Sequence, residues 1–289
     1  MNGLRSANYE KNIRFFSHFK EECEKKNMLV VSAFIDIGRE TWEPDFKRSN
    51  GQYFEHMKKF ILRLEHPMIF FTHEKYFEFI LSHRPKNFLT KLVKTEINDL
   101  ELYPYKERIV SIQNSEEYKS KIKRTCKNNP EFCKPDYDIV TNNKISFLNT
   151  ASFLVNANVY VWVDSGYGHG MIDVPPSFQL DFSKILSRPF LATVTILERK
   201  MSSEDPIQFF KDNPEYIDGG IIVVRKEFLK EYYVGYYALI KEFLQKNIID
   251  DDQYFSAIFK SRNKEKIQEI CIESWRNRKI LVNFLRKEP

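Results

Sequence analysis

The feature that most limits how this chain can fold is a regular alternation of short apolar runs with longer amphipathic stretches. The apolar runs are rich in β-branched and aromatic residues, which is typical of buried strands. Strands are predicted at residues 28–36, 68–72, 108–113, 158–163 and 190–198, and residues 216–225 are predicted to form a glycine turn that leads into a further strand. Helices are predicted at residues 8–26, 53–64, 73–83, 114–128, 139–157, 226–247 and 250–261, and a loop at residues 129–137. This order predicts an α/β fold with a mostly parallel sheet and helices on both of its faces.

The composition indicates one globular domain with a mixed surface charge. A hydrophobic fraction of 42% in 289 residues excludes a disordered chain. No repeat, low-complexity tract or linker divides the sequence, so a single domain is the simplest interpretation. The 45 basic and 40 acidic residues give a formal charge of +5. This excess is too small to indicate nucleic acid as a partner, and an anionic substrate or an acidic membrane surface fits equally well.

Two further classes of protein do not fit the sequence. The four cysteines form no C-x-x-C pair and have no histidine at zinc-ligand spacing, so we expect reduced thiols and no zinc knuckle. Charged residues interrupt the N-terminus, and no stretch approaches 18 uncharged apolar residues. We therefore expect neither a signal peptide nor a membrane-spanning helix, and we expect a cytoplasmic protein.

One predicted strand ends directly in a carboxylate, Asp164, and three glycines follow within six residues. Ligands of open α/β sheets bind outside the carboxyl ends of the strands, so this carboxylate is well placed to meet a substrate or a metal ion. Asp36-Ile37-Gly38-Arg39 follows the first strand in the same way. A parallel sheet would bring both sites to one edge. An aspartate at the end of a strand is also a common turn former, and that structural interpretation stays open.

Two more polar sites stand at the ends of predicted elements, and each has a structural alternative. The first is Asp250-Asp251-Asp252-Gln253, which also matches a capping box for the helix that follows. The second is Gly219-Gly220, which could simply allow a tight turn before a strand. For Arg39 and Arg84, a structural ion pair is an alternative to phosphate binding.

These segments together resemble the bacterial HtrL/YibB family. The resemblance runs in order from about residue 28 to residue 260, and its most specific parts are the D-I-G-R…W and W-x-D-x-G segments. The segments that carry it are Val31–Trp42, Met68–Thr72, Ile80 with Arg84, Val161–Tyr167 and Asp251-Asp252-Gln253. The resemblance implies a single Rossmann-like domain of the GT-A glycosyltransferase type, which is a step of analogy from fold to function.

The resemblance also implies a division of the domain and a set of donor-binding residues. It implies an N-terminal helix in residues 1–27, a nucleotide-binding half in 28–165, an acceptor-binding half in 166–262 and a basic C-terminal tail in 263–289. A glycine lets the backbone approach a ligand closely, and an arginine offers a planar fork to phosphate. The residues expected to bind the nucleotide and its diphosphate are Asp36, Gly38, Arg39, Arg84, Lys144, Gly219 and Gly220.

In GT-A enzymes a D-x-D motif holds a divalent cation that bridges the diphosphate of the donor. Here the motif reads Asp164-Ser165-Gly166, so the second aspartate is missing. The resemblance implies Mn²⁺ or Mg²⁺ at Asp164, with His169 as the second ligand; Asp173, or basic side chains that replace the metal, are alternatives. Asp251 or Asp252 would be the catalytic base of an inverting enzyme.

The implied function is transfer of a hexose from a UDP-sugar to a surface glycan such as lipopolysaccharide or capsule. The partners expected are the donor and the glycan acceptor, with no nucleic acid. The basic C-terminal tail could contact the inner face of the membrane, where lipid-linked acceptors reside. Two other classes stay open, a catalytically silent α/β module that binds a glycan or a protein, and a metal-dependent phosphodiesterase.

Overall fold

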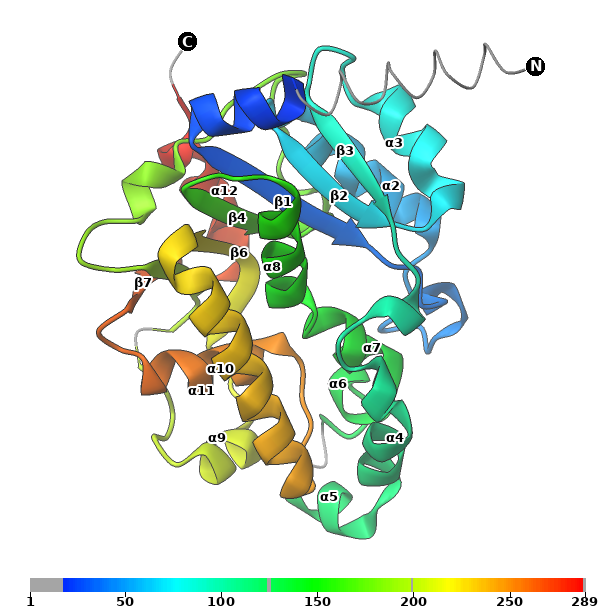
Figure 1. Ribbon diagram of the computed structural model, residues 1–289. Coiled ribbons are helices and arrows are strands. Elements are labelled where there is room, and N and C mark those ends of the chain that lie inside the picture. The colour runs from blue at the N-terminus through cyan, green and yellow to red at the C-terminus, as the bar shows by residue number, and fades with distance from the viewer. Residues whose placement is uncertain (1–17, 124–125, 199, 288–289) are drawn as a thin grey trace.

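The computed structural model describes residues 18–123, 126–198 and 200–287 (Figure 1). Its strands are β1 Met28–Phe34, β2 Met68–Thr72, β3 Thr90–Lys94, β4 Val159–Val163, β5 Ala192–Ile196, β6 Ile217–Arg225 and β7 Ile267–Cys271. Its labelled α-helices are α2 Asn50–Lys59, α3 Phe77–His83, α4 Lys106–Asn114, α5 Glu116–Lys121, α6 Pro130–Cys133, α7 Pro135–Thr141, α8 Lys144–Leu154, α9 Pro206–Asp212, α10 Lys226–Gln245, α11 Asp252–Arg262 and α12 Arg278–Leu285. A further helix covers residues 18–26, and the predicted helical residues 8–17 lie outside the described part.

The strands form one sheet in the order β3-β2-β1-β4-β6-β5-β7. All neighbouring strands are parallel except that β6 runs antiparallel to both β4 and β5. The predicted α/β fold with a mostly parallel sheet is confirmed. The reversal of β6 places the first half of β6 beside the end of β4, where Val163 pairs with Ile221.

Helices cover both faces of the sheet, as predicted. Successive residues of a strand point to opposite faces. In β1 this alternation sends Val31 into the core beneath α8, α10 and α11, and Val30 into the core shared by α2 and α12. Figure 1 shows α8 and α10 in front of the strands and α12 behind them. Because both faces are buried, the strands read as nearly continuous apolar runs.

The prediction of a strand at residues 108–113 is wrong. Those residues lie in α4, where Ile109, Ile112 and Gln113 are buried at helical spacing. A short apolar run of this kind fits a strand and a buried helix equally well. The strand that takes its place is β3, at the edge of the sheet. Its Thr-Lys-Leu-Val-Lys sequence carries two lysines, which are typical of an edge strand and which hid it from the apolar pattern.

Two other stretches also differ from the prediction. Residues 129–137 are not a loop, because α6 and the start of α7 lie there, each helix beginning with a proline at a position that tolerates it. Gly219 and Gly220 lie inside β6 and do not form a turn before it. Figure 1 shows α4 to α7 grouped beyond the sheet, at the lower right.

The C-terminal residues do not form a tail. β7 pairs with β5 in the sheet, and α12 packs Leu281, Val282 and Leu285 into the core. Arg278, one of the residues expected on a basic surface, is only 4% exposed. The outer face of α12 exposes Lys279, Ile280 and Phe284, Arg286 and Lys287 follow the helix at the surface, and membrane contact by this region stays a prediction.

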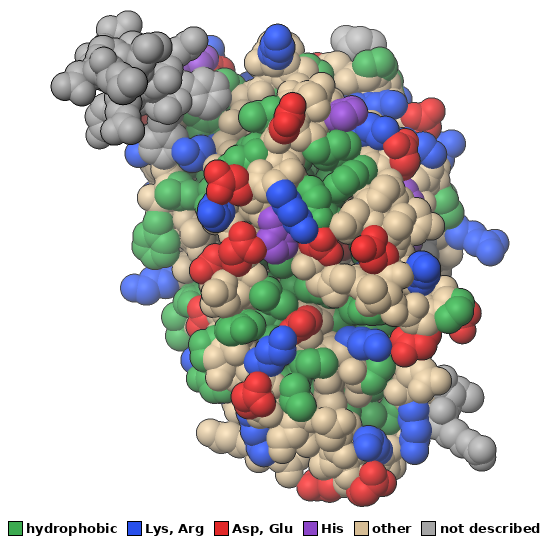
Figure 2. All heavy atoms as spheres, turned by 90° about the vertical axis from the view of Figure 1, so that its right-hand side faces the viewer, with side chains coloured by type: hydrophobic (Ala, Val, Ile, Leu, Met, Phe, Trp, Pro, Cys, Tyr) green, Lys and Arg blue, Asp and Glu red, His purple; other side chains and the backbone are tan. Residues whose placement is uncertain are grey.

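The surface seen in Figure 2 mixes acidic and basic side chains, in keeping with the small net charge. None of the helices within the described residues combines the length and the apolar composition needed to cross a bilayer.

A buried group of carboxylates lies between α7 and the start of α11. Asp138 is fully buried; its Oδ2 accepts a hydrogen bond of 2.8 Å from Gln113, and its Oδ1 has no hydrogen-bond partner among the described residues. Burial raises the pKa of Asp138 well above its usual range, and the neighbouring Asp250, Asp251 and Glu131 raise it further. Asp138 therefore keeps its proton in the folded state at pH values where the unfolded chain has lost it.

We expect Asp138→Asn to stabilise the protein at pH 8 by about 1 kcal/mol or more, because the amide keeps the bond to Gln113 and, unlike the carboxyl, needs no proton uptake on folding. For a carboxyl whose folded pKa is raised, stability falls as pH rises from the unfolded pKa near 4 toward the folded pKa. The gain should therefore be small at pH 4 and should grow with pH. Urea unfolding at pH 4, 6 and 8 measures it, and an equal gain at every pH would contradict this explanation.

Candidate functional site

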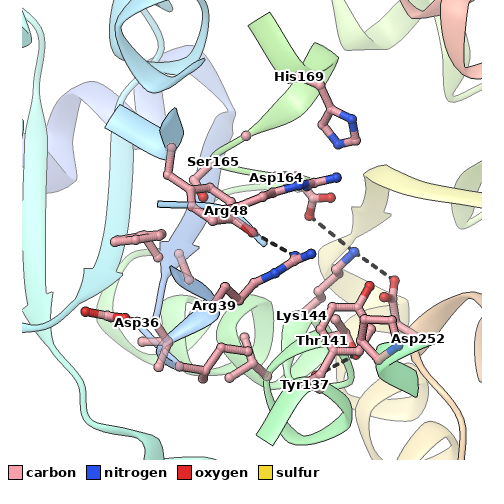
Figure 3. Close-up of a pocket in the computed structure, with 18 of the residues that line it drawn as sticks. Asp36, Arg39, Arg48, Tyr137, Thr141, Lys144, Asp164, Ser165, His169 and Asp252 are labelled. Atoms are coloured by element: carbon pink, nitrogen blue, oxygen red, sulfur yellow. Dashed lines mark hydrogen bonds and ion pairs between the residues drawn. The ribbon is translucent and has the colours of Figure 1, made fainter. Parts of the chain in front are cut away.

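A cleft of about 550 Å³ opens at the edge of the sheet where β1 and β4 end (Figure 3). Its lining comes from β1 and the loop after it, from α2, α7 and α8, from the end of β4, and from the first residues of β6, α11 and α12. Because β6 is antiparallel, its first residues reach this edge together with the last residue of β4. The topology thus collects polar side chains that are more than 200 residues apart in the sequence.

Lys144, the first residue of α8, lies at the centre of the cleft. Its Nζ is 2.8 Å from Asp252 Oδ2 and 3.2 Å from Asp164 Oδ1, and it donates a hydrogen bond of 2.9 Å to the carbonyl of Gly219. Burial opposes its charge, but the two carboxylates outweigh burial and raise the pKa of Lys144. Lys144 is therefore a permanent cation that joins β4, β6 and α11.

Asp164 lies one residue after β4 and is held in place from two sides. Its Oδ1 accepts a hydrogen bond of 2.6 Å from the Trp162 indole, and its backbone N–H donates to the carbonyl of Gly220. The indole in turn stacks on Phe147 at a ring-centroid distance of 5.8 Å. The Asp164 side chain keeps 33% exposure, whereas that of Asp252 keeps 5%. Asp164 thus presents a fixed carboxylate to the open part of the cleft.

The two aspartates predicted as alternative catalytic bases occupy different environments. Asp251 caps α11, since its Oδ1 accepts a hydrogen bond of 2.9 Å from the Gln253 N–H, and it is absent from the cleft lining. Asp251 is therefore the N-terminal cap of α11, as in the structural interpretation of this segment. Asp252 lines the cleft beside Lys144. Burial, opposed by Lys144 and assisted by Asp251 and Asp164, raises the pKa of Asp252 to about 7.

A second ion pair, which the sequence did not reveal, lines the cleft beside Lys144. Arg278 of α12 donates through Nε to Asp218 Oδ1 at 2.7 Å, and Thr195 donates to the other oxygen at 3.0 Å. Both members of the pair are nearly completely buried. The two residues are 60 positions apart, and only the placement of α12 against the start of β6 brings them together.

Asp36 has a structural role in the loop after β1. Its carboxylate accepts hydrogen bonds from the Gly38 N–H, Asn50, Lys75 and Tyr76 at 2.5 to 3.1 Å. Burial alone would raise its pKa, but these four donors hold the pKa well below its usual range. The loop they fix needs a left-handed residue, and Gly38 supplies it with a φ of +69°. Asp36 and Gly38 thus set the position of Arg39.

Arg39 and Arg48 bring positive charge to the cleft, and neither pairs with a carboxylate among the described residues. Arg39 donates to the Tyr53 hydroxyl at 2.8 Å and to the carbonyl of Phe46 at 3.1 Å, and its Nε is buried without a hydrogen-bond partner among the described residues. Its guanidinium lies over the Tyr137 ring, 5.6 Å from the centroid. Arg48, which the sequence interpretation overlooked, lines the same cleft, and no described residue pairs with its side chain (Figure 3).

The predicted role of Arg84 in phosphate binding is wrong. Its side chain is buried at 3% exposure and does not line the cleft. The guanidinium donates to the carbonyls of Leu64 and His66 at 2.7 and 2.8 Å and to the Thr90 hydroxyl. It therefore satisfies the backbone after the short helix at residues 61–63, and all its donor directions point into the protein.

The carboxylates of the cleft do not fit the expected Mn²⁺ or Mg²⁺ site. Within residues 18–123, 126–198 and 200–287, no three His, Cys, Asp or Glu side chains are arranged to hold a metal ion. Asp164 and Asp252 both face the ammonium of Lys144, which lies between them. His169 lines the cleft on a left-handed backbone with a φ of +46° and is partly exposed to solvent.

The fold and the site define an α/β protein with a charged cleft at the edge of its sheet where β1 and β4 end. A family model described as a bacterial protein of unknown function, HtrL_YibB, matches residues 26–270. The chain belongs to the HtrL_YibB family, which confirms the resemblance seen in the sequence. It is 29% identical over 241 residues to Protein HtrL of Escherichia coli strain K12, with 79% of this chain and 82% of that protein covered.

Solved glycosyltransferase structures are also similar to this chain. Core-mannan synthase A of Aspergillus fumigatus, in a form with manganese and GDP, is 11% identical, with 84% of this chain and 72% of that chain covered and a TM-score of 0.49. Mouse xyloside xylosyltransferase 1, in its apo form, is 9% identical, with 84% of each chain covered and a TM-score of 0.43.

Proposed function

We propose that this protein is a GT-A-type glycosyltransferase that moves a hexose from a nucleoside-diphosphate sugar, most simply a UDP-sugar, to a surface glycan. The observation that carries the proposal is one cleft in which two arginines, unpaired with any carboxylate of the described residues, lie beside a fixed set of carboxylates. A diphosphate needs positive donors, and sugar hydroxyls need carboxylate acceptors. The surface glycan, lipopolysaccharide or capsule, rests on the family resemblance.

In this proposal the diphosphate lies against Arg39 and Arg48, and the Tyr137 ring beside Arg39 offers an aromatic surface to the base. The hexose extends toward Asp164 and Asp252, which accept hydrogen bonds from its hydroxyls or from the acceptor. The acceptor oxygen attacks the anomeric carbon, the bond from that carbon to the diphosphate oxygen breaks, and Asp252 takes the acceptor proton in an inverting reaction.

Calorimetric titration with UDP tests the donor site. We expect the wild-type chain to bind UDP and Arg48→Ala to bind it about 10-fold or more weakly, because a charge-assisted hydrogen bond to phosphate is lost. Arg262→Ala is the matched control, since Arg262 pairs with Glu242 on the surface away from the cleft, and it should bind like wild type. Absence of binding to UDP and to every other nucleoside diphosphate would refute the proposed function.

A further inference from the structure

We propose that this cleft binds its nucleoside diphosphate without a divalent metal ion, because the ammonium of Lys144 permanently occupies the place between the two carboxylates. The inference rests on the proposed function and specifies how the donor's charge is met. It differs from the expectation, drawn from the family resemblance, of Mn²⁺ or Mg²⁺ at Asp164.

The oxygens around the Lys144 ammonium form a cation site that is already filled. Three oxygens surround Lys144 Nζ within 3.2 Å, from Asp164, Asp252 and the carbonyl of Gly219. One proton of the ammonium is donated to the Gly219 carbonyl, and its charge is paired with both carboxylates. Carboxylate and carbonyl oxygens are also the ligands that hard divalent cations prefer. The arrangement is therefore a cation site whose cation is part of the chain.

The Lys144 side chain is also held in this position by burial and by the packing of its helix. The side chain is only 10% exposed, and Lys144 begins a helix, α8, that packs against β1 and β4. A divalent ion at the same oxygens would lie next to a second positive charge in a poorly hydrated pocket, where like charges repel strongly. Withdrawing the ammonium would also leave it buried without a partner, which is costly for any charge.

The cleft also contains arginines that can balance the negative charge of a diphosphate. The other cations of the cleft are of two kinds, since Arg278 is paired with Asp218 whereas Arg39 and Arg48 have no carboxylate partner in the part of the chain that the structure describes. Two guanidinium groups supply the charge and the planar donor geometry that a diphosphate needs. The positive charge that a metal ion would bring to the leaving group is thus already present in side chains.

The decisive experiment titrates UDP into the wild-type chain in about 1 mM EDTA and again in about 5 mM MnCl₂. We expect dissociation constants that agree within about threefold. Binding that appears only with Mn²⁺, or is about tenfold tighter with it, would overturn the inference and leave the proposed function standing. Absence of binding in both buffers would instead refute the proposed function.

A second experiment removes the internal cation. Lys144→Ala leaves two carboxylates and one carbonyl facing an empty position, so this variant should bind Mn²⁺ at least about tenfold more tightly than wild type, as read from the free-ion signal in electron paramagnetic resonance. Lys144→Met is a second, bulkier variant, for use if the alanine variant fails to fold. Lys260→Ala is the control, because Lys260 pairs with a single carboxylate, Glu269. Mn²⁺ binding by wild type as tight as by the variant would overturn the inference.

Discussion

Asp252→Asn is expected to lower kcat/KM for sugar transfer by about 10²- to 10⁴-fold, the usual contribution of a general base, while the protein stays folded. The geometry singles out Asp252 because it lines the cleft, borders Lys144 at 2.8 Å and is nearly buried. Asparagine keeps the size of the side chain and can still accept from Lys144, so the substitution removes mainly the ability to take a proton.

The pH profile gives this prediction a second readout. The pKa of Asp252, raised to about 7 by burial and by its acidic neighbours, lies close to the working pH, which suits a base. A base is active when deprotonated, so wild-type kcat/KM should fall as pH drops below about 7. In Asp252→Asn the remaining activity should lose this acidic limb.

Asp251→Asn is the matched control, one residue away and chemically identical. Asp251 caps α11, and asparagine caps helices about as well as aspartate, so both stability and turnover should stay close to wild type. Equal losses in the two variants would contradict the assignment of the base to Asp252. Full transfer activity in Asp252→Asn would contradict it as well, and a chain without any transfer activity would favour the silent binding module.

How much of this site the sequence could predict depends on how local each signal is. Asp164 is detectable because an apolar strand ends in a carboxylate before a glycine-rich loop, and both events occur within a dozen residues. The same holds for Gly38 and Arg39. Lys144 was expected near a diphosphate, but its ion pairs with Asp164 and Asp252 span distances of 20 and 108 residues and depend on the order of the strands.

What the sequence missed depends on tertiary placement. The pair of Arg278 with Asp218 exists because β6 is reversed and α12 returns to the sheet, and neither fact leaves a periodic signal in the chain. The prediction that Arg84 binds phosphate is wrong for a related reason. An arginine that ends a helix near a predicted sheet edge looks the same in sequence whether its donors face a ligand or, as here, the carbonyls of Leu64 and His66. Burial, which sequence patterns do not give for a single polar residue, decides between them.

Gly219→Ala is expected to abolish most activity, by about 100-fold or more, because a new Cβ would lie 2.7 Å from Asp252 Oδ2 and 3.3 Å from Lys144 Nζ. The first distance is shorter than any normal contact, and backbone on β6 cannot easily retreat from it. Asp252 or Lys144 must therefore move, and either shift breaks the arrangement around the ammonium. The measurements are transfer rate, UDP affinity and the free energy of unfolding.

Gly38→Ala separates this crowding from the cost of backbone conformation. Gly38 and Gly219 have nearly the same left-handed φ, +69° and +67°, but a Cβ at Gly38 would meet no atom within 4 Å. Alanine at either position should cost about 1 to 2 kcal/mol of stability for the left-handed backbone alone. Gly38→Ala acts through the position of Arg39 and should at most weaken UDP binding, so only Gly219→Ala should add the loss of turnover at saturating donor. If both variants lost turnover equally, the activity would depend on left-handed glycines in general, and the contact between Gly219, Asp252 and Lys144 would have no special importance for catalysis.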